Sequence, residues 1–150
     1  MQLYYAIQNT HRTVGTRTSS EIVQRFGMRN SLQEDHLTVK LTGSAGQALG
    51  AFAAPGLKIE VSGDANDYVG KGLSGGMSVV RPPMVSPLIA ADNTIVGNTV
   101  LYGATDGFLF ASGRAGERFA VRNSGAKVVV EGCGSNGCES VSYTHLTLPT

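Results

Sequence analysis

A repeat of about twenty residues constrains the fold of this chain more than any other feature of its sequence. Residues 37–41 and residues 57–61 each alternate apolar and polar side chains, and each segment is followed by a hydroxyl residue and a glycine, Gly43 or Gly63. Gly50 recurs in the same way as Gly70. Strand-like segments that return at a fixed interval with glycine corners are typical of a chain that coils, with equivalent residues stacked on one another.

The apolar columns of this repeat extend through much of the chain. The same offset continues them beyond residue 61, although Arg81 breaks one column, and it extends the glycine column to Gly103. The members are Val39, Ile59, Val79, Thr99 and Phe119 in the first column and Leu41, Val61, Leu101 and Val121 in the second. This register predicts an all-β, single-stranded parallel β-helix with short strands on two or three faces, stacked about 4.8 Å apart. An ordinary β-sandwich is the alternative, which the column register disfavours.

Two features interrupt the repeat. Pro82 and Pro83, followed by Pro87, cannot donate ladder hydrogen bonds and predict a protruding loop. Strand-like segments then resume at residues 93–95, 98–101, 108–110 and 128–130. Before the repeat, residues 1–17 read as an entering strand and loop.

One short N-terminal helix is expected. Thr18 and Glu21 have the spacing of a capping box, with the hydroxyl at the helix start. Ile22, Val23 and Phe26 then give an apolar helical face, and Gly27 is a natural end.

Composition excludes several classes of partner and location. The chain has 150 residues, which fits one domain, and a net charge of +1, which supplies no field to attract nucleic acid or an anionic membrane. No apolar run approaches the roughly 20 residues of a membrane span, and no signal peptide is recognisable at the start. Two cysteines do not form a disulfide framework, so a cytoplasmic location is expected.

The strongest short motif is a G-x-G-x-x-G match at residues 70–75. A dinucleotide site needs a helix that begins in such a loop, and the residues after this loop are strand-like, so the match is interpreted as accidental. Gly72 also stands where a P-loop has Ser or Thr. Asp64 and Asp67 are expected to cap backbone groups, since two carboxylates are too few for a calcium site.

Other candidate residues give no catalytic, cofactor or metal site. His11, His36 and His145 are far apart, and Cys133 and Cys138 form a C-x4-C without a second half. Arg114, Arg118 and Arg122 with Glu117 are the densest charges; if a strand places Arg118 and Arg122 on one face, they form a solvated or partner-facing stripe.

Long motifs carry a family resemblance. They lie at residues 40–47, 50–52, 63–76, 95–107 and 113–126, and on them the chain resembles the C-terminal GXGXG domain of the glutamate synthase large subunit. The motif positions expected to be structural are Gly43, Gly46, Gly50, Gly63, Asp64, Asn66, Asp67, Gly70, Gly72, Gly75, Gly76, Gly103, Asp106, Gly107, Gly113, Arg114, Gly116, Arg118, Arg122, Asn123 and Gly125.

The resemblance implies a right-handed parallel β-helix and a parent oxidoreductase that makes glutamate from glutamine and 2-oxoglutarate. It implies that this domain is not an enzyme on its own and that it positions the amidotransferase and FMN synthase domains. FMN and an iron–sulfur cluster are then expected in those other domains, with no cofactor, nucleic acid or membrane bound by this chain. A stand-alone subunit of a related complex, glutamate-synthase-like or formylmethanofuran-dehydrogenase-like, and an independent ligand-binding protein are the alternatives.

The resemblance covers residues 5–139 and ends abruptly. After Glu139 the family continues with further glycine corners, whereas residues 140–150 lose the glycine pattern. We therefore expect a C-terminally truncated GXGXG domain over residues 1–139 and a non-native, poorly packed tail over residues 140–150.

Overall fold

The structure is a computed structural model that describes residues 1–27 and 36–139. The predicted tail, residues 140–150, lies outside these ranges. The elements are β1 (Gln2–Ile7), α1 (Thr16–Phe26), β2 (Leu37–Ala45), β3 (Leu57–Ala65), β4 (Ser74–Arg81), a 3-10 turn η1 (Ala90–Asp92), β5 (Thr94–Val96), β6 (Asp106–Ala111), β7 (Arg114–Ala115) and β8 (Lys127–Val129).

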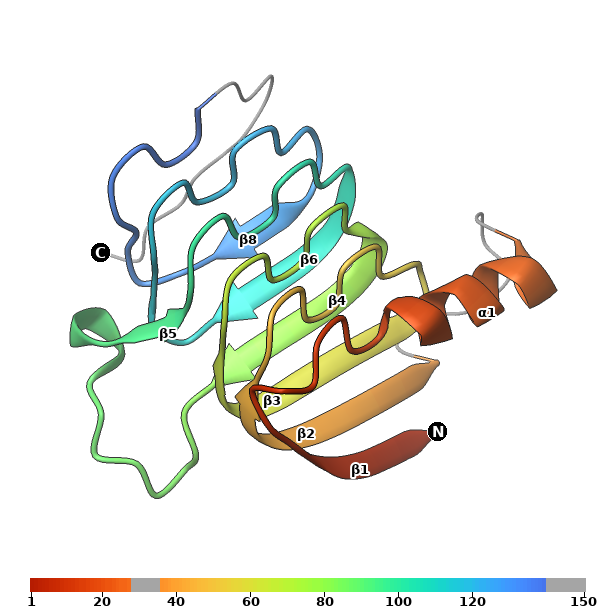
Figure 1. Cartoon of the computed structure of the whole chain (residues 1–150), viewed down its shortest axis with the longest axis horizontal. Coiled ribbons are helices and arrows are strands. Elements are labelled where there is room, and N and C mark those ends of the chain that lie inside the picture. Colours follow the sequence, from red (N-terminus) through yellow and green to blue (C-terminus); the bar gives the residue numbers. More distant parts are fainter. Residues whose placement is uncertain (28–35, 140–150) are drawn as a thin grey trace.

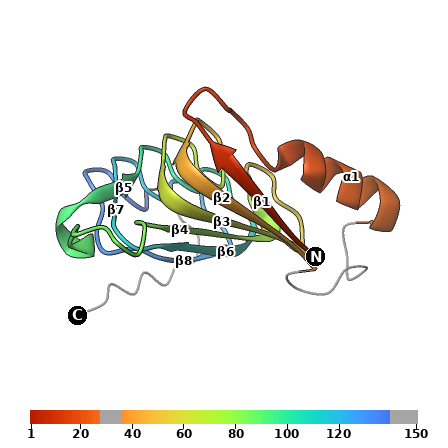
Figure 2. The same ribbon diagram turned by 90° about the horizontal axis from the view of Figure 1, so that it is seen from below.

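Most strands form a single parallel sheet. Its six strands have the order β1-β2-β3-β4-β6-β8, and a separate small sheet contains only β5 and β7 (Figure 1). Helix α1 lies at one end of the molecule and the small sheet at the opposite end (Figure 2). The expected right-handed parallel β-helix, with strands on two or three faces of every coil, is wrong: the described residues form a mostly parallel β-sheet with few helices.

The reason lies in the segments that return the chain from one strand to the next. In these return segments, residues 48–52, 68–72, 99–103 and 118–122, every second residue has a positive φ, between 53° and 68°. The positions are Ala48, Gly50 and Phe52; Tyr68, Gly70 and Gly72; Thr99, Leu101 and Gly103; Arg118, Ala120 and Arg122. A β-strand requires negative φ throughout, so these segments cannot add strands to a second large sheet.

The return segments nevertheless hydrogen-bond to one another. The Ala48 and Phe52 amides donate forward to the Asp67 and Lys71 carbonyls at 2.9 and 2.8 Å. The Gly50 amide, between them, donates backward to Val14 at 2.8 Å. Left-handed residues thus point their amides alternately to the next and to the previous segment, and the stack is bonded on both sides.

The core lies between the sheet and this stack. Leu49, Val69, Val100 and Phe119 occupy equivalent positions in successive return segments, and none is more than 1% exposed. They belong to the same cluster as the inward side chains of the sheet, among them Val61. Each turn of the chain therefore contributes both a strand and a return segment to one continuous apolar interior.

Strand register confirms part of the predicted repeat. Val39 pairs with Ile59, Leu41 with Val61, and Gly43 with Gly63, as the twenty-residue offset predicts. Strand β4 then pairs one residue earlier than predicted, so that the partners of Ile59 and Val61 are Ser78 and Val80. The column through Val79 is therefore wrong.

The later columns are also wrong, because their members are not in strands. Thr99 and Leu101 lie in a return segment with left-handed backbone, so the strand expected at residues 98–101 does not exist. Gly103 is equivalent to Gly72 and not to Gly63. The Gly72 amide donates to the carbonyl of Tyr102, which places the two segments side by side. Gly70 does stack beside Gly50, through the bond from its amide to Leu49.

The proline-rich segment leaves the stack as expected. It connects β4 to η1 and exposes Met84 and Val85 by 93% and 94%, with Leu88 and Ile89 more than half exposed. Strands resume in β5, β6 and β8, which confirms the three strand-like segments predicted around residues 94, 109 and 129.

The predicted capping box is wrong, although the helix exists and Gly27 ends it. Helix α1 begins at Thr16, and Gly15 occupies the N-cap without a side-chain hydrogen bond. The hydroxyls of Thr16 and Ser19 instead attach the helix to the first return segment. Thr16 donates to the Ala51 carbonyl at 2.7 Å, while Ser19 donates to the Phe52 carbonyl and accepts from the Ala54 amide.

Two glycines allow the cost of backbone strain to be measured apart from the cost of a close contact. Gly103 has a φ of 66° with open space around it, whereas a Cβ on Gly63 would overlap the carbonyl oxygen of Gly43. We expect Gly103→Ala to cost about 1–2 kcal/mol in free energy of unfolding, the cost of a left-handed alanine. Gly63→Ala must also separate β2 from β3 and should cost more than about 4 kcal/mol by urea denaturation. Equal costs would contradict this account of the strand contact.

Ser78 offers a stabilising change. Its side chain is fully buried, and its hydroxyl finds no hydrogen-bond partner among the described residues. Removing an unpaired buried hydroxyl should raise the free energy of unfolding by about 1 kcal/mol in Ser78→Ala. The exposed Ser44 is the control, since Ser44→Ala should change stability by less than about 0.5 kcal/mol. A destabilised Ser78→Ala would show that the hydroxyl has a partner in solution.

Candidate functional site

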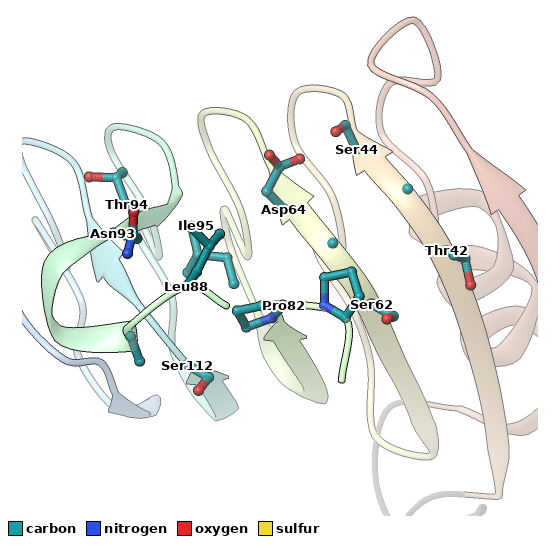
Figure 3. A pocket seen from close by; sticks show the side chains of 14 residues that line it. Thr42, Ser44, Ser62, Asp64, Pro82, Leu88, Asn93, Thr94, Ile95 and Ser112 are labelled. Carbon is teal, nitrogen blue, oxygen red and sulfur yellow. The ribbon is translucent and has the colours of Figure 1, made fainter. Parts of the chain in front are cut away.

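The first cavity lies where strands β2 and β3 end, beneath the proline-rich loop. Its volume is about 330 Å³. Pro82 and Leu88 from the loop and Ile95 from β5 form its apolar side, while Ser44 and Asp64 extend from the strand ends (Figure 3). The cavity is thus formed by the loop closing over one end of the sheet.

A second cavity of about 300 Å³ continues the first, sharing Ser44, Asp64, Thr94 and Ile95 with it. Among the described residues, Asp64 is the only ionisable side chain that lines either cavity. Within residues 1–27 and 36–139, no group of three or more His, Cys, Asp or Glu residues could hold a metal ion. Among the residues that the structure describes, the two cavities together therefore present one carboxyl side chain, that of Asp64.

The predicted capping role holds for only one of the two aspartates. Asp67 accepts a hydrogen bond from the Asn98 amide at 2.8 Å, and Asn98 in turn accepts one from the Glu117 amide at 2.9 Å. These side chains tie three successive turns together, which confirms the prediction for Asp67. Asp64 is exposed and caps no backbone group among the described residues, so the prediction is wrong there.

Asn123 instead fixes a single turn, through bonds to residues that closely follow it. Its side chain is 1% exposed, accepts from the amides of Gly125 and Ala126, and donates to the Ala126 carbonyl at 2.9 Å. Both ends of this buried amide are therefore used within the turn, as its burial requires.

The third cavity, of about 610 Å³, lies on the return segments. Its lining residues are Tyr68, Lys71, Thr99, Tyr102, Arg118, Val121, Asn136 and Glu139. The Lys71 ammonium lies 5.6 Å from the centre of the Tyr68 ring, and the Arg122 guanidinium lies 5.8 Å from that of Tyr102. We call this the basic cavity.

The arginine stripe is only partly as predicted. Arg118 and Arg122 are both exposed, but they lie on a return segment with φ of 53° and 56° and not on a strand. Arg114 belongs to β7 and does not line the basic cavity. The structure adds Lys71, which directly precedes Gly72 in the rejected P-loop match. No local sequence signal pointed to it, because it meets Arg118 only when the return segments are aligned.

The G-x-G-x-x-G match has the local structure that was expected. Strand β4 begins at Ser74, inside the match, and continues to Arg81. Gly70 and Gly72 occupy left-handed positions of a return segment. The glycines therefore serve the alternating backbone, and the helix that a pyrophosphate site of this type needs is not formed there.

Cys133 and Cys138 are both free and partly buried. Burial raises the pKa of the Cys138 thiol, and the neighbouring Cys133 raises this pKa further. An iron–sulfur cluster is held by about four cysteine thiolates. Two thiols, one of them less acidic than usual, do not fit such a group.

An ion-pair cluster lies on the outer face of the sheet. The Lys58 ammonium is 2.9 Å from one Glu60 oxygen, and Lys40 is 3.9 Å from the other. The hydrogen bond from Lys58 lowers the pKa of Glu60, and the positive charges of Lys58, Lys40 and Arg81 lower this pKa further, against the opposing effect of burial. The cluster joins β2 to β3.

No helix among the described residues is long and apolar enough to cross a membrane.

Comparison with known proteins gives a match over nearly the whole chain. The model of a family described as the GXGXG motif matches residues 1–144. The chain is 68% identical over 139 residues to the glutamate synthase [NADPH] large chain of Azospirillum brasilense. The aligned region covers 93% of this chain and 9% of that protein. It is 56% identical over 133 residues to the glutamate synthase [NADH] of Schizosaccharomyces pombe. That alignment covers 89% of this chain and 6% of that protein.

A ferredoxin-dependent relative matches as extensively. The chain is 51% identical over 135 residues to ferredoxin-dependent glutamate synthase 2 of Synechocystis, covering 90% of this chain and 8% of that protein. The chain thus spans between 6% and 9% of the length of these three relatives.

The Glu60 cluster predicts a pH dependence. Because the pKa of Glu60 is lower in the folded than in the unfolded chain, its stabilising effect is complete above the unfolded value, near 4.5, and is lost as the pH falls through the folded value. Lys58→Met should lower the free energy of unfolding at neutral pH by less than about 1 kcal/mol, as for a partly exposed pair. The difference from the unmodified chain should shrink as the pH falls below the unfolded value and vanish once Glu60 is protonated in the folded chain as well. A difference that persists in acid would mean that Lys58 acts by packing alone.

Proposed function

Because the chain belongs to the GXGXG family, we propose that it is a non-catalytic structural domain of a glutamate synthase. In this role it supports the glutamine-dependent reductive amination of 2-oxoglutarate to glutamate by holding the amidotransferase and FMN synthase domains in position. Those domains are its partners, and FMN and the iron–sulfur cluster belong to them.

The observation that carries this proposal is the similarity to relatives with three different electron donors. Proteins named for NADPH, NADH and ferredoxin match this chain at 68%, 56% and 51% identity over nearly the same extent. A region that served one electron donor would differ between these classes. A function that all three share, such as holding the reacting domains together, accounts for the match.

The stack of return segments supports a positioning role. Each segment is bonded to the one before and the one after, as with the amides of Gly70 and Tyr68, which donate to Leu49 and Asn98 at 2.9 Å. The parallel sheet adds a second set of ladders along the same direction. Bending the stack would break backbone hydrogen bonds on two sides at once, so the domain suits a rigid support.

A chimeric enzyme tests this function. The corresponding region of the Azospirillum large chain is replaced by residues 1–139, with and without Gly63→Ala. We expect the unmodified chimera to make glutamate from glutamine, and the Gly63→Ala chimera to lose most of this coupled activity. Glutamine hydrolysis and the use of free ammonia should persist, because the proposal leaves those reactions to other domains.

The matched control is Gly103→Ala, whose added methyl group meets no neighbour. This chimera should keep the coupled activity. If Gly63→Ala left coupled activity intact, or abolished each partial reaction as completely as the coupled one in a chimera that still bound FMN, the positioning role would be contradicted.

A further inference from the structure

We propose that the basic cavity binds a small oxyanionic ligand that carries phosphate or several carboxylate groups. Lys71 and Arg118 supply the charge, and the hydroxyls of Tyr68, Tyr102 and Thr99 supply neutral donors. This site is separate from the positioning role proposed above and can be tested in this chain alone.

The cations of the cavity lack internal counterions. In the described part of the chain, ion pairs join Arg25 to Glu21 and Lys40 and Lys58 to Glu60, and neither Lys71 nor Arg118 forms one there. Arg122, next to the cavity, has a tyrosine ring beside it and forms no ion pair with a described carboxylate. Lys71 lies on the return segment 68–72 and the two arginines on the segment 118–122, with the segment 99–103 between them. These three cations leave a local positive field in a chain whose net charge is only +1.

Among the described residues, one acidic side chain lines the cavity. Glu139 lines the cavity, and its carbonyl accepts the Arg122 amide at 3.2 Å. Glu117 precedes Arg118 in sequence but does not line the cavity. The facing groups therefore comprise two lining cations, a third at the margin and one carboxylate, which favours an anion with more than one negative charge.

The repeated left-handed backbone of the return segments aligns the side chains of the cavity. Tyr68, Thr99, Arg118 and Arg122 have φ between 53° and 61°, where glycine is favoured. Tyr68, Thr99 and Arg118 occupy the first left-handed position of successive return segments, where the first segment has Ala48, and Arg122 occupies the position of Gly72 and Gly103. The same backbone recurs along the stack, and in these three segments it brings Tyr68, Thr99 and Arg118 to one cavity.

The size and donor types of the cavity define the ligand class. A volume of about 610 Å³ lies within the range of small-molecule sites. Arginine pairs with phosphate or carboxylate through two parallel hydrogen bonds, and lysine contributes a point charge. The tyrosine faces are already occupied by Lys71 and Arg122, so a ring-stacked ligand is not favoured.

Titration calorimetry at low ionic strength on the whole 150-residue chain tests the site, with pyrophosphate and citrate as probes. We expect saturable binding of at least one probe with a dissociation constant of about 1 mM or tighter. Tighter pyrophosphate binding assigns a phosphate ligand, and tighter citrate binding assigns a polycarboxylate; both results support the site. Absence of saturable binding with both probes would overturn it.

Two variants locate the binding. Lys71→Met and Arg118→Gly should each weaken the tighter probe about tenfold, the effect of losing one charge-assisted hydrogen bond. Glycine suits the φ of 53° at position 118, so Arg118→Gly should also raise the melting temperature, which excludes unfolding as the cause of weaker binding. The matched control is Lys127→Met, because the Lys127 ammonium also lies over a ring, 5.7 Å from the centre of Phe108, but outside the cavity. Equal weakening in the control, or unchanged affinity in both cavity variants, would overturn the proposal.

Discussion

The structure depends on the alternation of left-handed residues in the return segments. This backbone directs successive amides up and down the stack, and it places Leu49, Val69, Val100 and Phe119 in the core. Each left-handed residue other than glycine costs about 1–2 kcal/mol, which hydrogen bonds on both sides and apolar burial must offset. Gly70 and Gly72 meet the requirement without that cost, and their spacing gives the G-x-G of the match at residues 70–75.

The same backbone explains which parts of the fold could be predicted from sequence. Strands β2 and β3 follow from alternating side chains and a constant offset, and their pairing was predicted residue by residue. Thr99 and Leu101 were misassigned because the return segments also bury apolar residues, such as Val100 and Leu101, and the twenty-residue offset runs from the strands into these segments. The sign of φ separates the two, and in sequence only glycine reveals it.

The candidate site, too, could be predicted from the sequence only in part. The capping role of Asp67 could be predicted, because Asp and Asn in a turn commonly bind backbone amides. The basic cavity could not, since Lys71 and Arg118 are far apart in sequence and meet only when their return segments are aligned. That alignment requires the length of the proline-rich loop, which no local pattern provides. The outer-face cluster of Lys40, Lys58 and Glu60 follows from the register of β2 and β3 once that register is known.

The proline-rich loop also determines where the chain tolerates a change in length. On either side of it the stack continues without a gap, since Tyr68 bonds to Asn98 and Val80 accepts the amide of Ser112. Residues added or removed between Pro82 and Asn93 would leave every strand pairing in place. One residue inserted into residues 48–52 would instead shift the left-handed conformation onto buried Leu49 and Ala51 and exchange the amides that point forward and backward. Among the corners of the described stack, insertions and deletions in homologous chains should therefore collect at this one.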